Sequence, residues 1–524
     1  MNLTLTPVRF KTRAEQEYAG KIGVVCGDVR MTYREFGERS DRLSNALVSL
    51  GTRRGERVAW LGYNCHRLLE AYYGVVQIGA VLLPLNIRLT PQEIAFILND
   101  SESTVIFYDR DFLPIVEAVR GSAETIQHYI PLDPKGDGLD YEQFISGGAP
   151  DFQPVDVKDD DLAELFYTSG TTANPKGVMM THRNLYLHAL QAMAGLTIKD
   201  SNVQLHTIPL FHVNGWGTPH TITCAGARHV VVKKFDPSQV LELVQQERVT
   251  HFSMVPTMAT ALVNHPSLGE YDLSSLEYVG LGGAASPVDL IREVEQKMGC
   301  RAYAGYGLTE TTPVLTFSFV KQHLEDVSDE QRWKRQAMTG YPMPGVEMSI
   351  VDPDDRHLPH DGVSVGEIVV RADNVMAGYW KQPEDTAQVM RGGWFHTGDM
   401  AVVDEEGYYL IVDRKKDIII SGGENISSLE VEKAVYSHPA VLECAVIAVP
   451  DDRWGEVPKA LVVVKPGQEL SEAELCDYCR TKLPGFKVPK SIDFMPSLPK
   501  GGTGKILKKE LREQYWQGYE KRVH

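Results

Sequence analysis

Residues 165–181 read LFYTSGTTANPKGVMMT, and this stretch carries the strongest structural signal in the 524-residue chain. A β-rich run leads into a hydroxyl-rich loop made of Thr168, Ser169, Gly170, Thr171 and Thr172, and Lys176 follows. Hydroxyl and backbone N–H groups in such a loop can bind phosphate oxygens, and the lysine adds a positive charge. The loop is not a Walker A loop. In that motif the lysine is followed by Ser or Thr, whereas Lys176 is followed by glycine. The loop is a candidate phosphate site, although its composition alone equally fits a polar surface loop.

Helical and strand-like patterns alternate on both sides of this loop. Helical spacing of apolar residues predicts helices over residues 33–50, 66–79, 91–98 and 237–247. β-rich runs predict strands at residues 57–61, 80–84, 104–108, 230–232, 251–255 and 277–281. This alternation predicts an α/β fold with layered, substantially parallel sheets. Shorter strands over residues 346–370 suggest a β-rich subdomain.

A charged run, DRKK at residues 413–416, marks the predicted domain boundary. We expect a large N-terminal domain over residues 1–415 and a small α+β domain over residues 416–524, with the charged junction as a hinge. Strands are predicted at 441–449 and 461–464. Two capping-box spacings indicate helix starts in the small domain: Ser427 with Glu430, and Ser471 with Glu474.

Composition narrows the classes of protein. The apolar fraction of 43% is typical of a soluble globular chain, and the net charge of −17 argues against nucleic-acid binding. The longest apolar stretch, residues 71–85, is too short to span a bilayer, and no targeting segment is apparent, so a cytoplasmic location is expected. Cys476 and Cys479 form a CxxC that is better explained by an amphipathic helix than by a zinc site.

Residues 168–177 resemble the phosphate-binding signature of the adenylate-forming superfamily, which contains acyl-CoA synthetases, peptide-synthetase adenylation domains and beetle luciferase. Similar elements recur in the same order along nearly the whole chain: YAGYGLTETTP at 303–313, WFHTGD within 392–414, and LPKGGTGKIL at 498–507. The resemblance implies a large N-terminal domain and a small, mobile C-terminal domain. It also implies that ATP, Mg²⁺ and coenzyme A take part.

The resemblance implies a role for each matching residue in binding the nucleotide. Gly282, Gly283 and Ala284 would form a wall beside the adenine, and Tyr306 would stack near it. Thr309 would contact the α-phosphate region and Glu310 would bind Mg²⁺, while Asp399 and Arg414 would contact the ribose. Lys505, in the small domain, would stabilise the charge that develops during adenylation. Taken singly, each residue also fits an ordinary turn, cap or solvated surface position.

Other matches imply a second step, in which the acyl group passes to coenzyme A. Gly422 and Gly423 would form part of the passage for the pantetheine arm, or else a simple hairpin turn. Lys416 aligns with the family's hinge position. The small domain would rotate about this hinge between the two half-reactions.

The sequence PLFHVNGW at 209–216 resembles the acyl-pocket motif of fatty-acyl-CoA ligases and methylmercaptopropionate ligases. The implied pocket consists of His212, Val213, Asn214, Trp216 and Gly305, with His212 as a gate beside the substrate carboxylate; a structural histidine is the alternative. No acidic residue lies in 211–216 to pair with a substrate ammonium, which favours an amine-free acid. Our first expectation is a medium- or long-chain fatty acid, ahead of a short thioether or aryl acid.

The sequence therefore predicts an acid–CoA ligase with Lys505, Thr309 and His212 as catalytic residues. Two alternatives stay open: an adenylation enzyme that serves a carrier protein, and a non-catalytic nucleotide sensor. The expected partners are a small carboxylic acid, ATP and coenzyme A, and a homodimer is an expectation from the resemblance.

Overall fold

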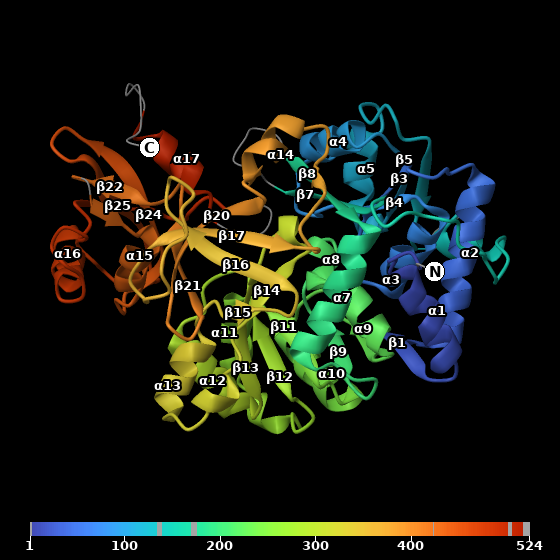
Figure 1. Cartoon of the computed structure of the whole chain (residues 1–524), viewed down its shortest axis with the longest axis horizontal. Helices are drawn as coiled ribbons and strands as arrows, with labels where there is room; N and C mark the ends of the chain where they lie inside the picture. The colour runs from blue at the N-terminus through green and yellow to red at the C-terminus, as the bar shows by residue number, and fades with distance from the viewer. Residues whose placement is uncertain (1–2, 134–138, 169–174, 423, 501–505, 517–524) are drawn as a thin grey trace. The chain divides into compact units, whose positions relative to one another are not determined.

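The computed structural model describes residues 3–133, 139–168, 175–422, 424–500 and 506–516. The chain divides into two compact units: unit 1 is Met1–Met348 with Val370–Phe395, and unit 2 is Ser349–Val369 with His396–His524 (Figure 1). The boundary predicted between residues 415 and 416 is that of a domain that moves as a body. It stays a prediction.

A nine-stranded sheet forms one layer of unit 1. Its order is β15 (Tyr341–Pro342), β14 (Val314–Phe317), β13 (Arg301–Gly307), β12 (Tyr278–Leu281), β11 (His251–Met254), β9 (Val203–His206), β10 (Arg228–Val231), β1 (Ile22–Cys26) and β2 (Val29–Thr32). The strands from β13 to β1 pair in parallel, and the remaining edge strands pair antiparallel. Helices α9 and α10 contact β9 (Figure 1). The predicted α/β architecture with parallel strands is confirmed.

A seven-stranded sheet carries the phosphate-loop motif. Its order is β18 (Gly378–Tyr379), β8 (Lys176–Thr181), β7 (Leu162–Thr168), β4 (Val81–Pro84), β3 (Arg57–Leu61), β5 (Ser103–Tyr108) and β6 (His128–Pro131). Strands β7 and β8 form an antiparallel hairpin, with Thr168 opposite Lys176. The sheet therefore positions both ends of the loop between these two residues.

The four helices predicted in unit 1 are present, and two of them, α2 and α10, have the predicted bounds. Helix α2 begins at a capping box between Thr32 and Glu35 and ends at Gly51, whose φ of 98° suits glycine. The helix predicted over residues 66–79 instead ends at Gly74, and a 3-10 turn completes the stretch up to Gly79. The α-helices are α1 (Val8–Glu17), α2 (Tyr33–Leu50), α3 (His66–Gly74), α4 (Pro91–Asp100), α5 (Leu113–Val119), α6 (Tyr141–Ser146), α7 (His182–Leu196), α8 (Val213–Trp216), α9 (Thr218–Ala225), α10 (Pro237–Glu247), α11 (Pro256–Val263), α12 (Val288–Met298), α13 (Asp329–Gln336) and α14 (Pro383–Val389).

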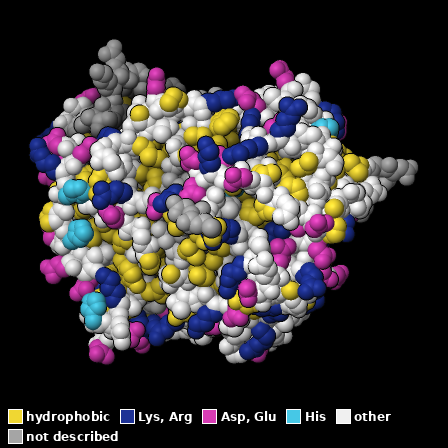
Figure 2. All heavy atoms as spheres, turned by 45° about the vertical axis from the view of Figure 1, so that its right-hand side comes forward, with side chains coloured by type: hydrophobic (Ala, Val, Ile, Leu, Met, Phe, Trp, Pro, Cys, Tyr) yellow, Lys and Arg dark blue, Asp and Glu magenta, His cyan; other side chains and the backbone are white. Residues whose placement is uncertain are grey.

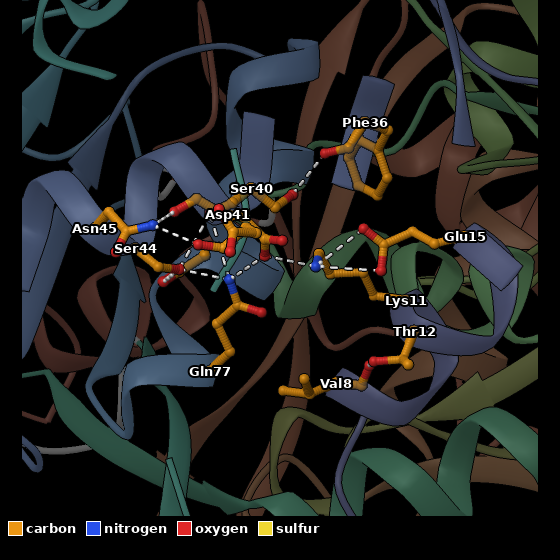
Figure 3. Close-up of polar contacts among 12 residues, drawn as sticks. Val8, Lys11, Thr12, Glu15, Phe36, Ser40, Asp41, Ser44, Asn45 and Gln77 are labelled. Atoms are coloured by element: carbon orange, nitrogen blue, oxygen red, sulfur yellow. Dashed lines mark hydrogen bonds and ion pairs between the residues drawn. The ribbon is translucent and has the colours of Figure 1, made fainter. Parts of the chain in front are cut away.

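A buried lysine links the first two helices of unit 1. Lys11 of α1 lies between Glu15 and Asp41, with Nζ 2.7 Å from Asp41 Oδ1 (Figure 3). Gln77 donates to the same oxygen at 2.8 Å and to Ser44 Oγ. Because a buried charge is costly unless it is paired, this network favours one packing of α1 on α2.

Unit 2 contains the small α+β module that the sequence predicts. Its sheet has the order β23 (Glu424–Ile426), β22 (Ile419–Ser421), β25 (Gly455–Val464) and β24 (Val441–Asp451), with β26 (Ser491–Phe494) beside β25. Helices α15 (Ser428–Tyr436) and α16 (Glu472–Arg480) begin at the predicted caps Ser427 and Ser471, and α17 spans Lys508–Glu513. The expected β-rich segment forms a separate sheet of β16 (Val346–Val351), β17 (Gly366–Ala372), β20 (Trp394–Val403), β19 (Met390–Arg391) and β21 (Tyr409–Arg414).

Surface and composition features fit a globular protein. On the face drawn in Figure 2, lysine and arginine side chains lie among aspartate and glutamate side chains. Within the described ranges, no helix combines the length and apolar composition that crossing a membrane requires. All seven cysteines are free thiols, and Cys476 and Cys479 are buried on α16.

Candidate active site

The lysine of the phosphate-loop motif is held by a carboxylate that the sequence analysis missed. Lys176 begins β8, and its Nζ lies 2.6 Å from Oδ2 of Asp385 in α14. The ammonium group also lies 5.2 Å from the centre of the Tyr379 ring, within cation–π range. Lys176 therefore has a defined direction at the base of the loop. The predicted ligands Ser169, Gly170, Thr171 and Thr172 lie outside the described residues.

Tyr379 connects this lysine to the predicted metal ligand. Its hydroxyl donates to Oε1 of Glu310 at 2.9 Å, and the backbone N–H of Met376 donates to the Glu310 carbonyl at 2.8 Å. Burial, followed by the nearby Glu310 carboxylate, raises the pKa of Tyr379, which stays a neutral donor. The structure thus brings Lys176 and Glu310 into one polar cluster. No sequence signal pointed to Tyr379, which lies in a two-residue strand.

Two other residues of unit 1 that are predicted to contact the nucleotide, Tyr306 and Thr309, lie close to Glu310 in the sequence. Tyr306 is half-buried near the end of β13, beside Gly305, and Thr309 is buried in the 3-10 turn Thr309–Thr311. Within the described part, no cluster of three or more His, Cys, Asp or Glu side chains is arranged to bind a metal. Among the described acidic residues, Glu310 is the predicted metal ligand of this region.

The predicted adenine wall also contacts the acyl motif. A Cβ atom at Gly282 would lie 3.0 Å from Cη2 of Trp216 and 3.2 Å from the carbonyl oxygen of Gly305. Gly283, with a φ of 76°, faces the same indole, and Ala284 is exposed. Glycine is required here because Trp216 occupies the space that a side chain would fill. Segments 209–216, 282–284 and 303–313 therefore meet in one place.

The acyl motif adopts an unusual backbone that the sequence did not reveal. Residues 213–217 all have positive φ values: Val213 46°, Asn214 40°, Gly215 55°, Trp216 64° and Gly217 79°. Left-handed backbone costs L-residues about 1–2 kcal/mol each. His212 is half-buried and immediately precedes this left-handed turn. The two glycines were the only local signal for it.

In unit 2, the two predicted ribose contacts are cross-strand neighbours. Asp399 of β20 pairs with Arg414 of β21, and Arg414 Nε lies 3.3 Å from Asp399 Oδ1. Asp399 is 4% exposed, so its carboxylate is fixed by its surroundings. An aspartate beside an arginine can accept hydrogen bonds from ribose hydroxyls while its charge stays compensated.

The predicted coenzyme A and hinge residues of unit 2 are only partly described. Gly422 has a φ of 60°, its N–H donates to the Trp454 carbonyl at 2.8 Å, and a Cβ atom there would lie 2.6 Å from the indole. Gly423 and Lys505 lie outside the described residues. Lys416 is exposed between β21 and β22.

Helix α17, which follows Lys505 in the sequence, is attached to the predicted hinge segment by charged groups. Arg512 Nη1 lies 3.0 Å from Asp417 Oδ1 and donates to the Lys416 carbonyl at 3.2 Å. Lys508 Nζ lies 2.8 Å from Glu432 Oε1 and donates to Ser428 Oγ at 2.7 Å. The same serine donates to the carboxylate of Asp413 at 3.2 Å. Burial opposes the charge of Lys508, but Glu432 and Asp413 outweigh it and raise the pKa of Lys508.

Comparisons with known proteins agree with this arrangement. The model of the family described as AMP-binding enzyme matches residues 10–380, and that of the AMP-binding enzyme C-terminal domain matches residues 430–505. A long-chain-fatty-acid–CoA ligase of Thermus thermophilus is 41% identical over 497 residues, which cover 94% of this chain and 91% of that protein. A peroxisomal butyrate–CoA ligase of Arabidopsis thaliana is 36% identical over 538 residues, covering 98% and 93%. The anthranilate CoA ligase AuaEII in complex with anthranoyl-AMP is 29% identical, with a TM-score of 0.87 over 98% of both chains.

The chain therefore belongs to the AMP-binding enzyme family. Within this family it is an AMP-forming acid–CoA ligase, with ATP, coenzyme A and a carboxylic acid as substrates. The predicted membership of the adenylate-forming superfamily, the fold and the type of enzyme are confirmed. The acids named for the relatives differ in length and shape.

Proposed function

We propose that this ligase activates a medium- or long-chain fatty acid. The observation that carries the proposal is the acyl motif itself, whose lining combines Trp216 with the buried Phe211 and Val213. The buried carboxylate that touches the motif, Glu164, is engaged by Asn214 and His220 and is not available to pair with a substrate ammonium. The relative named for long-chain fatty acids shares 41% of its aligned residues with this chain.

The first half-reaction joins the acid to AMP and releases pyrophosphate. Thr168, the loop up to Thr172 and Lys176 bind phosphate oxygens, and Asp385 holds the Lys176 ammonium in place. Tyr306 and the Gly282–Gly283 wall contact the adenine, Thr309 contacts the α-phosphate region, and Asp399 with Arg414 binds the ribose. Lys505 neutralises the charge that develops between carboxylate and α-phosphate, a contribution that is large where water is excluded.

Glu310 fits a magnesium ion bound together with a nucleotide. Mg²⁺ prefers oxygen ligands and is usually held by one or two carboxylates plus phosphate oxygens and waters. A single glutamate, oriented by the Tyr379 hydroxyl at 2.9 Å, matches that mode of binding. The bound ion would neutralise phosphate charge.

The second half-reaction transfers the acyl group to the thiol of coenzyme A. Gly422 and Gly423 leave room for the pantetheine arm, and the small domain rotates about Lys416 between the two steps. His212 lies beside the carboxylate as the gate of the acyl pocket. Rotation lets one carbonyl group meet Lys505 first and the thiol afterwards.

The test is a screen of pyrophosphate release, with and without coenzyme A, across straight-chain acids of increasing length plus aryl and thioether acids. We expect the highest kcat/KM for a straight-chain acid of medium or greater length. A maximum at an aryl or short thioether acid would overturn the proposed substrate. Acylation of a carrier protein in place of coenzyme A would support the adenylation-enzyme alternative.

One observation favours a shorter or flatter acid as the second candidate. The Trp216 indole lies against Gly282 and Gly283, where it takes up space beside the acyl motif. The butyrate and anthranilate ligases among the relatives are named for such acids. The same screen separates the two candidates.

A further inference from the structure

A buried carboxylate connects the phosphate-loop strand to the acyl motif. Glu164 lies on β7, four residues before Thr168, and is fully buried. Its Oε2 accepts a hydrogen bond from Asn214 Nδ2 at 2.8 Å, and its Oε1 lies 2.7 Å from His220 Nε2. Neither half-reaction described above uses Glu164. A buried carboxylate costs free energy, so both of its oxygens need these partners.

Asn214 links Glu164 to the backbone of the left-handed turn. Its Nδ2 donates to Glu164, while its Oδ1 accepts from the N–H of Gly217 at 2.7 Å. The side chain is fully buried, and both ends of its amide are occupied by protein groups. Asn214 therefore acts as a brace between β7 and the end of the turn.

The turn needs such a brace because its own sequence does not favour it. Val213 and Trp216 both take left-handed φ values, which persist in proteins only where the surroundings over-determine them. At the far end, a Cβ atom on Gly217 would overlap the ring of His188. The direction of Trp216 toward Gly282 thus depends on a backbone conformation held from outside the motif.

We propose that Glu164 is a positioning residue for binding of the acid: through Asn214 it maintains the left-handed turn that presents His212 and Trp216 to the acyl pocket. This proposal rests on the proposed function of residues 209–216 as the acyl motif. Because Glu164 acts on the turn and not on the phosphates, its loss raises KM for the acid and leaves KM for ATP unchanged.

The donor and acceptor roles of the pair allow a reversal experiment. Asn214→Asp places a second carboxylate against Glu164, and we expect KM for the acid to rise about ten- to hundred-fold. Glu164→Gln alone still offers one acceptor oxygen and raises KM by a few-fold. In the double variant, the amide nitrogen of the introduced glutamine donates to the introduced aspartate, while its amide oxygen accepts from His220. We expect this reversed hydrogen bond to return KM to within about threefold of the parent value.

Glu70→Gln is the matched control. Glu70 is also a fully buried carboxylate, but its side-chain partners are Arg39 and Tyr141 and not Asn214 and His220. It reports any general effect of removing a buried charge, and thermal unfolding is recorded for every variant. Should Asn214→Asp fail to fold, Glu164→Gln and the double variant still carry the test.

Three results would overturn the proposal: KM values for ATP and acid that rise together, a Glu70→Gln variant with the same acid KM defect, or a folded double variant without recovery. The Trp216→Ala variant distinguishes failure of the positioning proposal from failure of the proposed function. If Trp216→Ala changes neither the acid KM nor the preferred chain length, residues 209–216 are not the acyl pocket. If it changes them while the Glu164 and Asn214 variants do not, the positioning role alone is wrong.

Discussion

Residues 209–217 in unit 1 and residues 413–417 in unit 2 are held by different kinds of interaction. The first segment is a left-handed turn braced by neutral amide groups and one fully buried carboxylate, Glu164. The second is a junction in which Lys416 and Asp417 are bonded directly to Arg512 of α17, and Asp413 is linked to Lys508 through Ser428. One segment has its backbone conformation imposed from a neighbouring strand. The other is joined to the helix that follows the Lys505 loop.

The difference corresponds to the two tasks of the enzyme. A pocket that recognises an acid needs a fixed shape, and breaking a hydrogen bond to a buried carboxylate costs about 1.5–3 kcal/mol. A domain that rotates needs its parts to stay together as it moves. Under the proposed rotation about Lys416, the charged links between α17 and the junction would keep the small domain together. The predictions below test each side of this comparison.

The largest effect is expected from Lys505→Ala, which removes the charge that we propose for adenylation. We expect adenylate formation to fall by about 10²–10³-fold or more, while ATP binding stays within a few-fold. Acid-dependent pyrophosphate exchange and ATP titration measure the two quantities. Unchanged exchange would contradict the assignment of Lys505.

Lys508→Met is expected to destabilise unit 2, because it leaves Glu432 and Asp413 buried without their cation. The free energy of unfolding should fall by about 3 kcal/mol. Urea unfolding monitored by limited proteolysis assigns the loss to unit 2. Lys509→Met is the control, since the Lys509 side chain is 54% exposed and its ion pair with Glu513 is long, at 3.7 Å. An equal loss of unfolding free energy in both variants would show that the buried ion pair contributes no more to stability than the exposed one.

Lys416→Pro should separate the two half-reactions. Proline restricts the backbone at the predicted hinge, so we expect thioester formation to slow by at least about tenfold while adenylation changes little. Single-turnover assays of adenylate formation and of transfer to coenzyme A measure the steps independently. Lys416→Ala retains backbone freedom and should behave like the parent. Equal losses in both steps would refute the hinge.

The last difference concerns the pH dependence of stability, and it is expected in unit 1. Burial lowers the pKa of His66, His188 and His206 to about 3, and that of His182 and His251 to about 4. These histidines stay neutral in the folded chain, whereas in the unfolded chain they take up protons near pH 6.5. Their stabilising contribution is therefore present above pH 6.5 and is lost as the pH falls toward 4.

Thermal unfolding between pH 7.5 and pH 5, with cleavage sites mapped by limited proteolysis, measures this difference. We expect unit 1 to become susceptible to proteolysis at a higher pH than unit 2. If both units became susceptible at the same pH, or unit 2 at the higher pH, the result would contradict this expectation.

Short-range sequence patterns predicted several helices and strands, and the resemblance of the motifs predicted the type of reaction. Strand β3 and helices α2 and α10 have the predicted bounds, because apolar spacing and end signals such as Gly51 act over a few positions. The motifs around Lys176 and Glu310 predicted the reaction class through their resemblance to the adenylate-forming superfamily, since their residue types alone also fit ordinary surface positions.

The contacts that position these motifs depend on the tertiary structure. Nothing local connects Asp385 and Tyr379 to Lys176, or Glu164 to Asn214 fifty residues away. The left-handed turn at residues 213–217 even opposes the preference of Val213 and Trp216. Such features arise from packing between strands distant in the chain, where burial makes each unpaired polar group too costly and so selects partners that no short stretch of sequence specifies.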